Sequence, residues 1–176
     1  DVANNCAGAL TQSEALNVSL FILDTTGPTL LAFDMDLNAT NVTLTFDEVV
    51  NASTLSVKEI TIQNMQAYFP TVMHMLTVTE SVVGYGRIVV FRLSSADKNA
   101  MLALGGIITT AQNTYMSITT DTILDYYGNY VHEIRPRVAL PVRNFLADTL
   151  NPQVMSSSLD LNTGILTLNF SETVDI

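Results

Sequence analysis

The chain has 176 residues, a net charge of -10 and a hydrophobic content of 48%. Its seven Lys and Arg residues are scattered, which excludes the basic patch that nucleic acid or an anionic membrane surface requires. No apolar run of about 18 residues is present, so no membrane-spanning helix is predicted. The apolar content is ample for a packed core and excludes a disordered chain.

The first 27 residues are a lead-in that contains Cys6, the sole cysteine. A single cysteine excludes a disulfide within the chain, so Cys6 is a candidate for an intermolecular disulfide, and a free thiol is the alternative. Residues 15–21 have a strand-like pattern. Threonines flank Pro28 in a composition that suits O-glycosylation or a simple linker: Thr25, Thr26 and Thr29.

Alternating apolar residues predict a hairpin next. TLLAFDMD and NVTLTF are strand-like and are joined by the turn signal DLN. In the second strand Val42, Leu44 and Phe46 fall on one face. Further strand patterns follow in STLSVKEITIQN, TVMHMLTVT, RIVVFRLS, TYMSIT, TILDYYGNYVHEI and VALPVRNFLAD.

One helix is predicted among these strands, in SSADKNAMLALGG. Ser94 is a candidate N-cap, Asp97 occupies the capping-box position, and Gly105 and Gly106 end the helix. Short strands with one short helix predict an all-β fold, and a β-sandwich in particular.

One phrase occurs twice. DLNATNVTLTFDEVV at 36–50 returns as DLNTGILTLNFSETV at 160–174, so that Asp36 and Asp160 are 124 residues apart. At the same separation ALNVSLFILDTTGP (15–28) matches ALPVRNFLADTLNP (139–152) without a gap. We interpret this as a tandem duplication of a bead-like unit.

The duplication divides the chain into three parts. Residues 1–27 are a lead-in and a candidate donor or linker strand, 28–151 are a full unit, and 152–176 are the first strands of a second, partial unit. Because an incomplete sandwich is unstable alone, we expect either a longer array or a neighbour to supply the missing strands.

The order of a proline, a strand, a DLN turn, LTLTF and N-A-S-T-L is similar to the Ig-like repeats of surface-layer and other cell-surface proteins. In that family TFSEPV is followed by STL and then ITL, and the matching positions here are 45–49, 53–55 and 60–62. ADKNAMLALGGIITTAQNTYMSITTDTILDYYGNYV also resembles repeats of algal and protist extracellular proteins, some of which build flagellar hairs and glycoprotein filaments. The resemblance covers essentially the whole chain and implies an Ig-like antiparallel sandwich. Val49 and Thr173 replace the family's proline, which leaves this strand freer to pair.

Motifs for catalysis are not found in the sequence. His74 and His132 lie in strand-like contexts without a second ligand at metal spacing, so structural roles are expected. No G-x-S-x-G elbow occurs, and Gly84 and Gly86 lack the third glycine of a dinucleotide site. We therefore predict that the chain is not an enzyme and needs no cofactor.

The weak candidate for a metal site is DMDLN. Asp34, Asp36 and Asn38 alternate like the start of a calcium loop, but Ala39 replaces the required glycine and Thr45 the closing acid. A solvated strand edge explains the same pattern, so calcium is the less favoured interpretation.

Five N-x-[ST] sequons are present, and they predict N-linked glycans if the chain enters a glycosylating secretory pathway. They begin at Asn17, Asn38, Asn41, Asn51 and Asn169. Ordinary strand and turn roles for these residues are the alternative. Glycans would supply the hydration that a surface with few charges lacks.

These features predict an extracellular structural glycoprotein of the cell surface or an appendage. Its copies would assemble head to tail into a fibre or surface layer, with strand complementation as one route. The alternative is a carbohydrate- or ligand-binding adhesion module of a larger secreted protein, and a glycosidase-associated domain is a third. A sugar-stacking platform could come only from Tyr126, Tyr127 and Tyr130, for which we expect turn and core positions instead.

Overall fold

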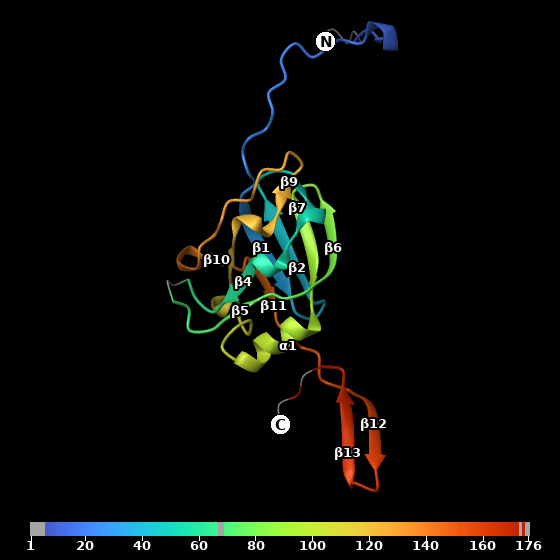
Figure 1. Cartoon of the computed structure of the whole chain (residues 1–176), viewed down its shortest axis with the longest axis vertical. Helices are drawn as coiled ribbons and strands as arrows, with labels where there is room; N and C mark the ends of the chain where they lie inside the picture. Colours follow the sequence, from blue (N-terminus) through green and yellow to red (C-terminus); the bar gives the residue numbers. More distant parts are fainter. Residues whose placement is uncertain (1–5, 67–68, 173, 175–176) are drawn as a thin grey trace.

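The computed structural model describes residues 6–66, 69–172 and 174, and it is built mostly of β-strands with one α-helix (Figure 1). This confirms the predicted all-β class. The strands are β1 Leu30–Asp36, β2 Asn41–Phe46, β3 Val50–Asn51, β4 Ile60–Gln63, β5 Met73–Met75, β6 Thr79–Tyr85, β7 Ile88–Leu93, β8 Tyr115–Ile118, β9 Leu124–Asp125, β10 Leu140–Pro141, β11 Asn144–Leu146, β12 Val154–Asp160 and β13 Ile165–Phe170. The helix α1 is Ser95–Leu104.

Two sheets enclose the core in a sandwich-like arrangement. One has the strand order β11-β1-β2-β7-β6, and the other has the order β10-β8-β4-β5. Alternate residues of both sheets point into one apolar cluster, to which the predicted inward face of β2 contributes Val42, Leu44 and Phe46, all buried. Burial of each such side chain stabilises the fold by about 1.5–3 kcal/mol. We call the two sheets and the helix, residues 28–146, the body.

The last stretch of the body belongs to both sheets. β10 pairs antiparallel with β8, and three residues later β11 pairs parallel with β1. The crossover lies between the Val142 N–H, which donates to the Thr114 carbonyl, and the Arg143 N–H, which donates to the Phe33 carbonyl. This short segment therefore closes one edge of the sandwich on both sides.

Helix α1 follows β7 and has the predicted cap. The Ser94 hydroxyl accepts a hydrogen bond from the Asp97 N–H at 3.0 Å, and Gly105 ends the helix with a φ of 64°. The Asp97 carboxylate accepts hydrogen bonds from the backbone N–H of Thr77 and contacts Nε2 of His74 at 2.8 Å. These contacts attach the helix to the segment between β5 and β6. The helix has ten residues, and among the described residues no helix is long and apolar enough to span a bilayer.

Three predicted strands differ from the structure. STLSVKEITIQN forms 3-10 turns at Ala52–Thr54 and Val57–Glu59 and is a strand only in β4. Residues 15–21 form no strand, because no neighbouring strand supplies the ladder that an extended segment needs. TILDYYGNYVHEI forms only the two-residue β9, which pairs with β3, and a turn held by Asp125, whose carboxylate accepts the N–H groups of Tyr127 and Asn129. Local hydrogen bonding of an aspartate therefore replaces the expected strand.

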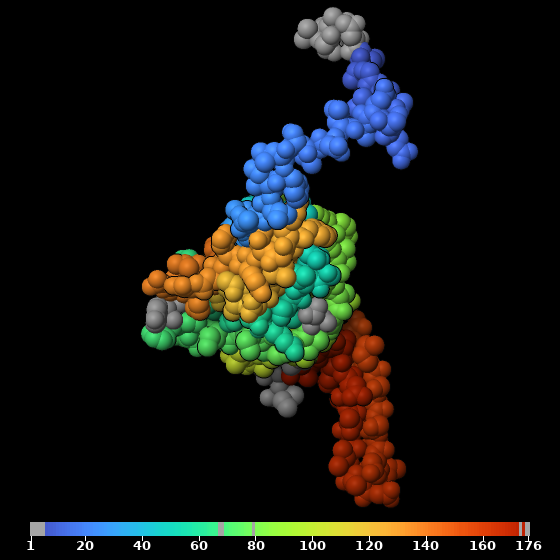
Figure 2. Space-filling view, turned by 45° about the horizontal axis from the view of Figure 1, so that its top comes forward, coloured from blue at the N-terminus to red at the C-terminus, as the bar shows by residue number. Residues whose placement is uncertain are grey.

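Two parts of the chain project from the body. The β12–β13 hairpin forms a sheet of its own beyond the end that carries α1, and the N-terminal segment leaves from the opposite end (Figure 1). The space-filling view shows both projections, blue and red, extending from the compact body (Figure 2).

Candidate assembly site

The β12–β13 hairpin repeats the β1–β2 hairpin residue for residue. In the first, Leu30 pairs with Phe46, a bulge follows, and Ala32 pairs with Thr45. In the second, Val154 pairs with Phe170, a bulge follows, and Ser156 pairs with Asn169. Each of these positions is 124 residues from its counterpart. Two stretches of different sequence thus adopt one register, including its irregularity.

The turns of the two hairpins also correspond. Asp36 Oδ1 accepts the backbone N–H groups of Asn38 and Ala39, each at 2.9 Å. In the second turn Asp160 Oδ1 accepts the N–H of Asn162 at 2.8 Å, and this bond lowers the pKa of Asp160. The last turn residue has a positive φ in both, 55° at Thr40 and 71° at Gly164. The DLN phrase therefore encodes the same aspartate-held turn twice.

The apolar faces of the two hairpins differ in burial. Leu37 is 1% exposed and its counterpart Leu161 is 85% exposed, while Phe46 is 1% exposed and Phe170 is 37% exposed. We call the apolar side of the second hairpin the hairpin face; it consists of Val154, Leu159, Leu161, Leu166, Leu168 and Phe170, all exposed. Within the described residues nothing covers this face as the second sheet covers β1 and β2.

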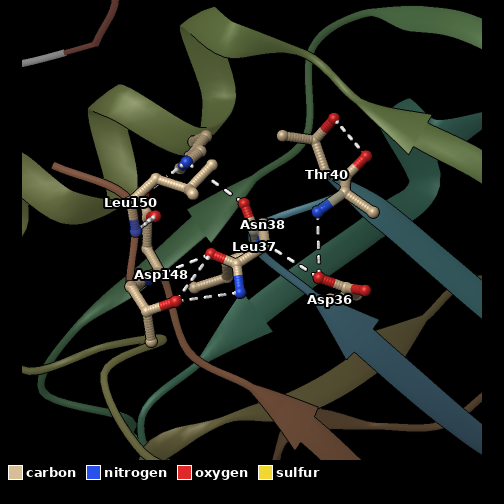
Figure 3. A network of polar contacts seen from close by, with 9 residues as sticks. Asp36, Leu37, Asn38, Thr40, Asp148 and Leu150 are labelled. Atoms are coloured by element: carbon tan, nitrogen blue, oxygen red, sulfur yellow. Dashed lines mark hydrogen bonds and ion pairs between the residues drawn. The ribbon is translucent and has the colours of Figure 1, made fainter. Parts of the chain in front are cut away.

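A polar junction holds the segment between the body and the hairpin. Lys98 of α1 donates to the Leu37 carbonyl at 3.2 Å and pairs with Asp148 Oδ2 at 2.5 Å. The Asn38 Oδ1 atom accepts the Thr149 N–H at 2.9 Å. Figure 3 shows the turn residues Asp36 to Thr40 facing the segment that carries Asp148 and Leu150. The chain leaving the body is thus fixed against the β1–β2 turn.

The charges at this junction are coupled. Burial opposes ionisation of Asp148, but hydrogen bonds from Lys98 and from the Leu150 N–H outweigh it, so the pKa of Asp148 is lowered. Burial and the neighbouring Asp148 charge raise the pKa of Glu172, which follows the hairpin. A groove of about 630 Å³ lies beside these groups, and its lining includes Asn38, Lys98 and Glu172. The base of the hairpin is therefore in electrostatic contact with the body.

The N-terminal segment exposes a second set of apolar side chains. Leu16, Val18 and Phe21 are 85%, 72% and 64% exposed. The segment is held to the body at its C-terminal end. The Asp24 carbonyl accepts a hydrogen bond from Nδ2 of Asn129, and the Pro28 carbonyl accepts one from the N–H of His132. Its apolar residues before Asp24 extend into solvent (Figure 2).

The five sequon asparagines lie on the surface or close to it. Asn17 is on the N-terminal segment, Asn41 begins β2, and both are exposed. Asn169 is exposed on β13 and donates from Nδ2 to Ser156 Oγ. Asn38 lies at the junction, and Asn51 is half-buried with Oδ1 accepting the Ser53 N–H at 3.2 Å. Glycosylation at these sites remains a prediction.

The other predicted modification sites are exposed, with the exception of Thr29. Cys6 is an exposed free thiol. Thr25 and Thr26 are exposed, and the Thr26 hydroxyl donates to Asp24. Thr29 is half-buried, and its N–H donates to Asp47 Oδ1 at 2.7 Å. This hydrogen bond fixes the backbone of Thr29 and does not involve its hydroxyl group, which is the group that an O-linked glycan would occupy.

The residues of the weak calcium candidate each have a different protein partner. Asp34 forms an ion pair with Arg143, Asp36 holds its own turn, and Asn38 binds Thr149. Hydrogen bonds from Arg143, which outweigh partial burial, lower the pKa of Asp34. Calcium at these residues stays the less favoured interpretation.

The structure brings together an acidic trio that sequence reasoning missed. Ligand atoms of Asp24, Glu48 and Asp125 lie within 4.8 Å of one another. Burial and the charge of Asp24 raise the pKa of Glu48. Burial works against ionisation of Asp125, but the N–H groups of its turn lower its pKa overall. The three residues come from three distant segments, so no local spacing could have signalled them.

The tyrosines and histidines have distinct positions. Tyr126, Tyr127 and Tyr130 are exposed around the β9 turn, so the turn position is observed and the expected core position is wrong; the aspartate-held turn directs them outward. His74 is partly buried against Asp97, and His132 is exposed. The Ser94 and Thr77 hydroxyls both donate to Asp97, so this network joins helix and strands.

Comparisons with known proteins gave no relatives. No protein-family model, curated protein or solved structure matches the chain.

Proposed function

We propose that the protein is an extracellular structural glycoprotein made of Ig-like units in series, which join head to tail in a fibre or a surface layer. The observation that carries this proposal is the second hairpin, which has the register, bulge and turn of the first and an uncovered apolar face. A face of this kind is stabilised by a covering partner, because each buried side chain contributes about 1.5–3 kcal/mol.

The junction supports a fixed geometry between successive units. Lys98 and Asp148 are only 10% and 15% exposed, and they join the helix of one unit to the segment that leads into the next hairpin. Asn38 and Thr149 add hydrogen bonds in the same place. A chain of units that holds its angles suits a load-bearing polymer better than a flexible string does.

Surface chemistry supports the extracellular, glycosylated part of the proposal. The chain has few charged residues, 14%, and exposed sequon asparagines on several faces. N-linked glycans at Asn17, Asn41 and Asn169, and O-linked glycans at Thr25 and Thr26, would hydrate a surface that carries few charged side chains.

Expression of the full chain in a secretory eukaryotic host tests the proposal. We expect mass spectrometry to find occupied sequons, and light scattering with electron microscopy to find linear particles with a regular bead spacing. A secreted chain that is unglycosylated and monomeric at all concentrations would contradict it.

A second candidate function is carbohydrate binding. The observation in its favour is the group of exposed tyrosines at the β9 turn, beside the carboxylates of Asp24 and Glu48 in one shallow pocket lined by Tyr126 and Tyr127. Exposed aromatic rings stack on sugars, and carboxylates accept sugar hydroxyls. A glycan-binding screen of the chain and of its Tyr126→Ala, Tyr127→Ala variant distinguishes this function from assembly.

A further inference from the structure

The chain contains two lysines, and one of them is held against a carboxyl group away from water. Lys58 is exposed, whereas the side chain of Lys98 is 10% exposed and that of its partner Asp148 is 15% exposed. Lys98 Nζ lies 2.5 Å from Asp148 Oδ2. An amine and a carboxyl group are the two reactants of an amide bond, and fixing them in contact raises their effective concentration by orders of magnitude.

The two oxygens of Asp148 have different partners. Oδ2 faces the lysine, and Oδ1 accepts the backbone N–H of Leu150 at 3.1 Å. Figure 3 shows Asp148 and Leu150 together, beside the turn between β1 and β2. A backbone donor in this position stabilises the negative charge that develops on a carbonyl oxygen when its carbon is attacked. Oδ1 is therefore placed to carry charge, and Oδ2 is placed to leave.

Glu172 adds a proton donor at the same point. Its carboxyl group shares a hydrogen bond with Asp148, and burial together with the Asp148 charge raises the pKa of Glu172. Two carboxyl groups share a hydrogen bond only when one of them carries a proton. Lys98 and Glu172 also line the groove described above, which gives a released water molecule a path to solvent.

We infer that Lys98 and Asp148 condense into an isopeptide bond, with Glu172 as the group that delivers and accepts protons. The ion pair first exchanges a proton and becomes a neutral amine and a carboxylic acid, which shielding from water favours. The hydrogen bonds of Asp148 keep its pKa low, so this neutral form is the minor one and the reaction is slow.

The reaction balances without a further reactant. The lone pair of Nζ attacks Cγ of Asp148, and the charge on Oδ1 is held by the Leu150 N–H. Glu172 gives its proton to Oδ2, which leaves as water, and takes one from Nζ. One C–N bond forms, one C–O bond breaks, one water is released, and Glu172 returns to its starting state.

The product keeps the contacts of the junction. Lys98 Nζ donates to the Leu37 carbonyl at 3.2 Å, and an amide nitrogen retains one N–H for this bond. The Leu150 N–H still has Oδ1 as its acceptor. Condensation therefore removes two charges from a shielded place and leaves neither of these polar groups without a partner.

The first hairpin offers a comparison within the same chain. Asp24 and Glu48 stand 124 residues before Asp148 and Glu172, and their carboxylates also lie close together, within 4.8 Å. The third group of that cluster is the carboxylate of Asp125. Three acids contain no amine nucleophile, so no bond is expected among them.

Intact-mass spectrometry of the full chain, produced in a host without N-glycosylation, tests the inference. We expect a mass one water below that of the sequence, and a digest that contains a branched peptide joining residue 98 to residue 148. Acetylation of free amines should modify Lys58 and spare Lys98. Lys98→Arg keeps the positive charge but cannot condense, so it should have the full mass. Lys58→Arg is the matched control and should still lose the water.

A time course of the mass tests the proton donor. Glu172→Gln should slow formation of the bond by about a hundredfold or more, whereas Glu48→Gln, at the equivalent position of the first hairpin, should leave the rate unchanged. A wild-type chain that keeps its full mass, or a loss of water that persists in Lys98→Arg, overturns the inference. Equal rates for Glu172→Gln and the wild type overturn the role of Glu172. The bond lies within one chain, so each of these results is independent of the proposed head-to-tail assembly, which has its own test.

Discussion

Lys98 Nζ lies 2.5 Å from Asp148 Oδ2, and this pair joins the only α-helix of the described residues to the segment that leaves the body. The lysine also donates to the Leu37 carbonyl, so one ammonium group holds three separate stretches of chain together. Both side chains are largely shielded from water. Removing one partner of a shielded pair costs more than removing one partner of an exposed pair, because the remaining charge is left shielded and uncompensated.

Lys98→Met should loosen the junction, because it leaves the Asp148 carboxylate shielded and without its cation. We expect a loss of about 1–3 kcal/mol in local stability, read from faster amide exchange at Thr149 and Leu150. Lys58→Met is the matched control, since Lys58 is exposed. Equal exchange rates in the two variants would show that the pair does not hold the junction.

The ionisation of Asp97 should make the stability of the protein depend on pH in the acidic range. Burial acts to raise the pKa of this residue, but hydrogen bonds from His74, Thr77 and Ser94 outweigh this effect and lower the pKa from 3.8 to about 2. A carboxyl group whose pKa is lower in the folded state than in the unfolded state stabilises the protein at pH values above the unfolded pKa, near 3.8. This stabilisation is lost as the pH falls towards 2. The contribution is about 2 kcal/mol.

Urea unfolding between pH 2 and pH 6 measures this effect. Asp97→Asn should be less stable than the wild type at pH 6 and should lose part of the pH dependence, while Asp121→Asn, at an exposed site, should behave as the wild type. Parallel pH profiles for Asp97→Asn and the wild type would contradict the assignment.

The two hairpins offer a matched comparison of burial. Phe46 is 1% exposed, and its counterpart Phe170 is 37% exposed. Phe46→Ala should cost about 3–5 kcal/mol of unfolding free energy, whereas Phe170→Ala in dilute, unassociated chains should cost less than about 1 kcal/mol. Chemical denaturation of the two variants checks this, and similar costs would mean that a partner covers Phe170 in solution.

Gly27 is required by a close backbone approach. A Cβ atom at this position would lie 1.9 Å from the Tyr130 carbonyl oxygen. Gly27→Ala should therefore push residues 24–28 away from the β9 turn and lower the melting temperature, with Gly8→Ala as a control because a Cβ there meets no atom within 4 Å. An unchanged melting temperature for Gly27→Ala would show that the segment shifts without cost.

Alternation and turn signals predicted much of the fold. The inward face of β2, the DLN turn and the cap of α1 by Ser94 all follow from local spacing, and the structure confirms them. The Ig-like arrangement was inferred from resemblance, and the structure supports only the coarser description of an all-β, sandwich-like fold.

Long-range features were beyond sequence reasoning. The acidic trio joins residues 24, 48 and 125, and Lys98 meets Asp148 across 50 positions. The crossing of 139–146 from one sheet to the other depends on which strands are available at the edge, which no local pattern records. Residues 15–21 show the opposite case. Their pattern is that of a strand, but they form none because no neighbouring strand pairs with them.

The parallel pairing of β1 with β11 has a mechanical consequence. The chain enters the body through β1 and leaves it through β11, and because these strands run in the same direction, the two points lie at opposite ends. Tension applied along a polymer of such units would load the ladder between them in shear. All of its hydrogen bonds would then resist at once, instead of opening one after another as in a zipper.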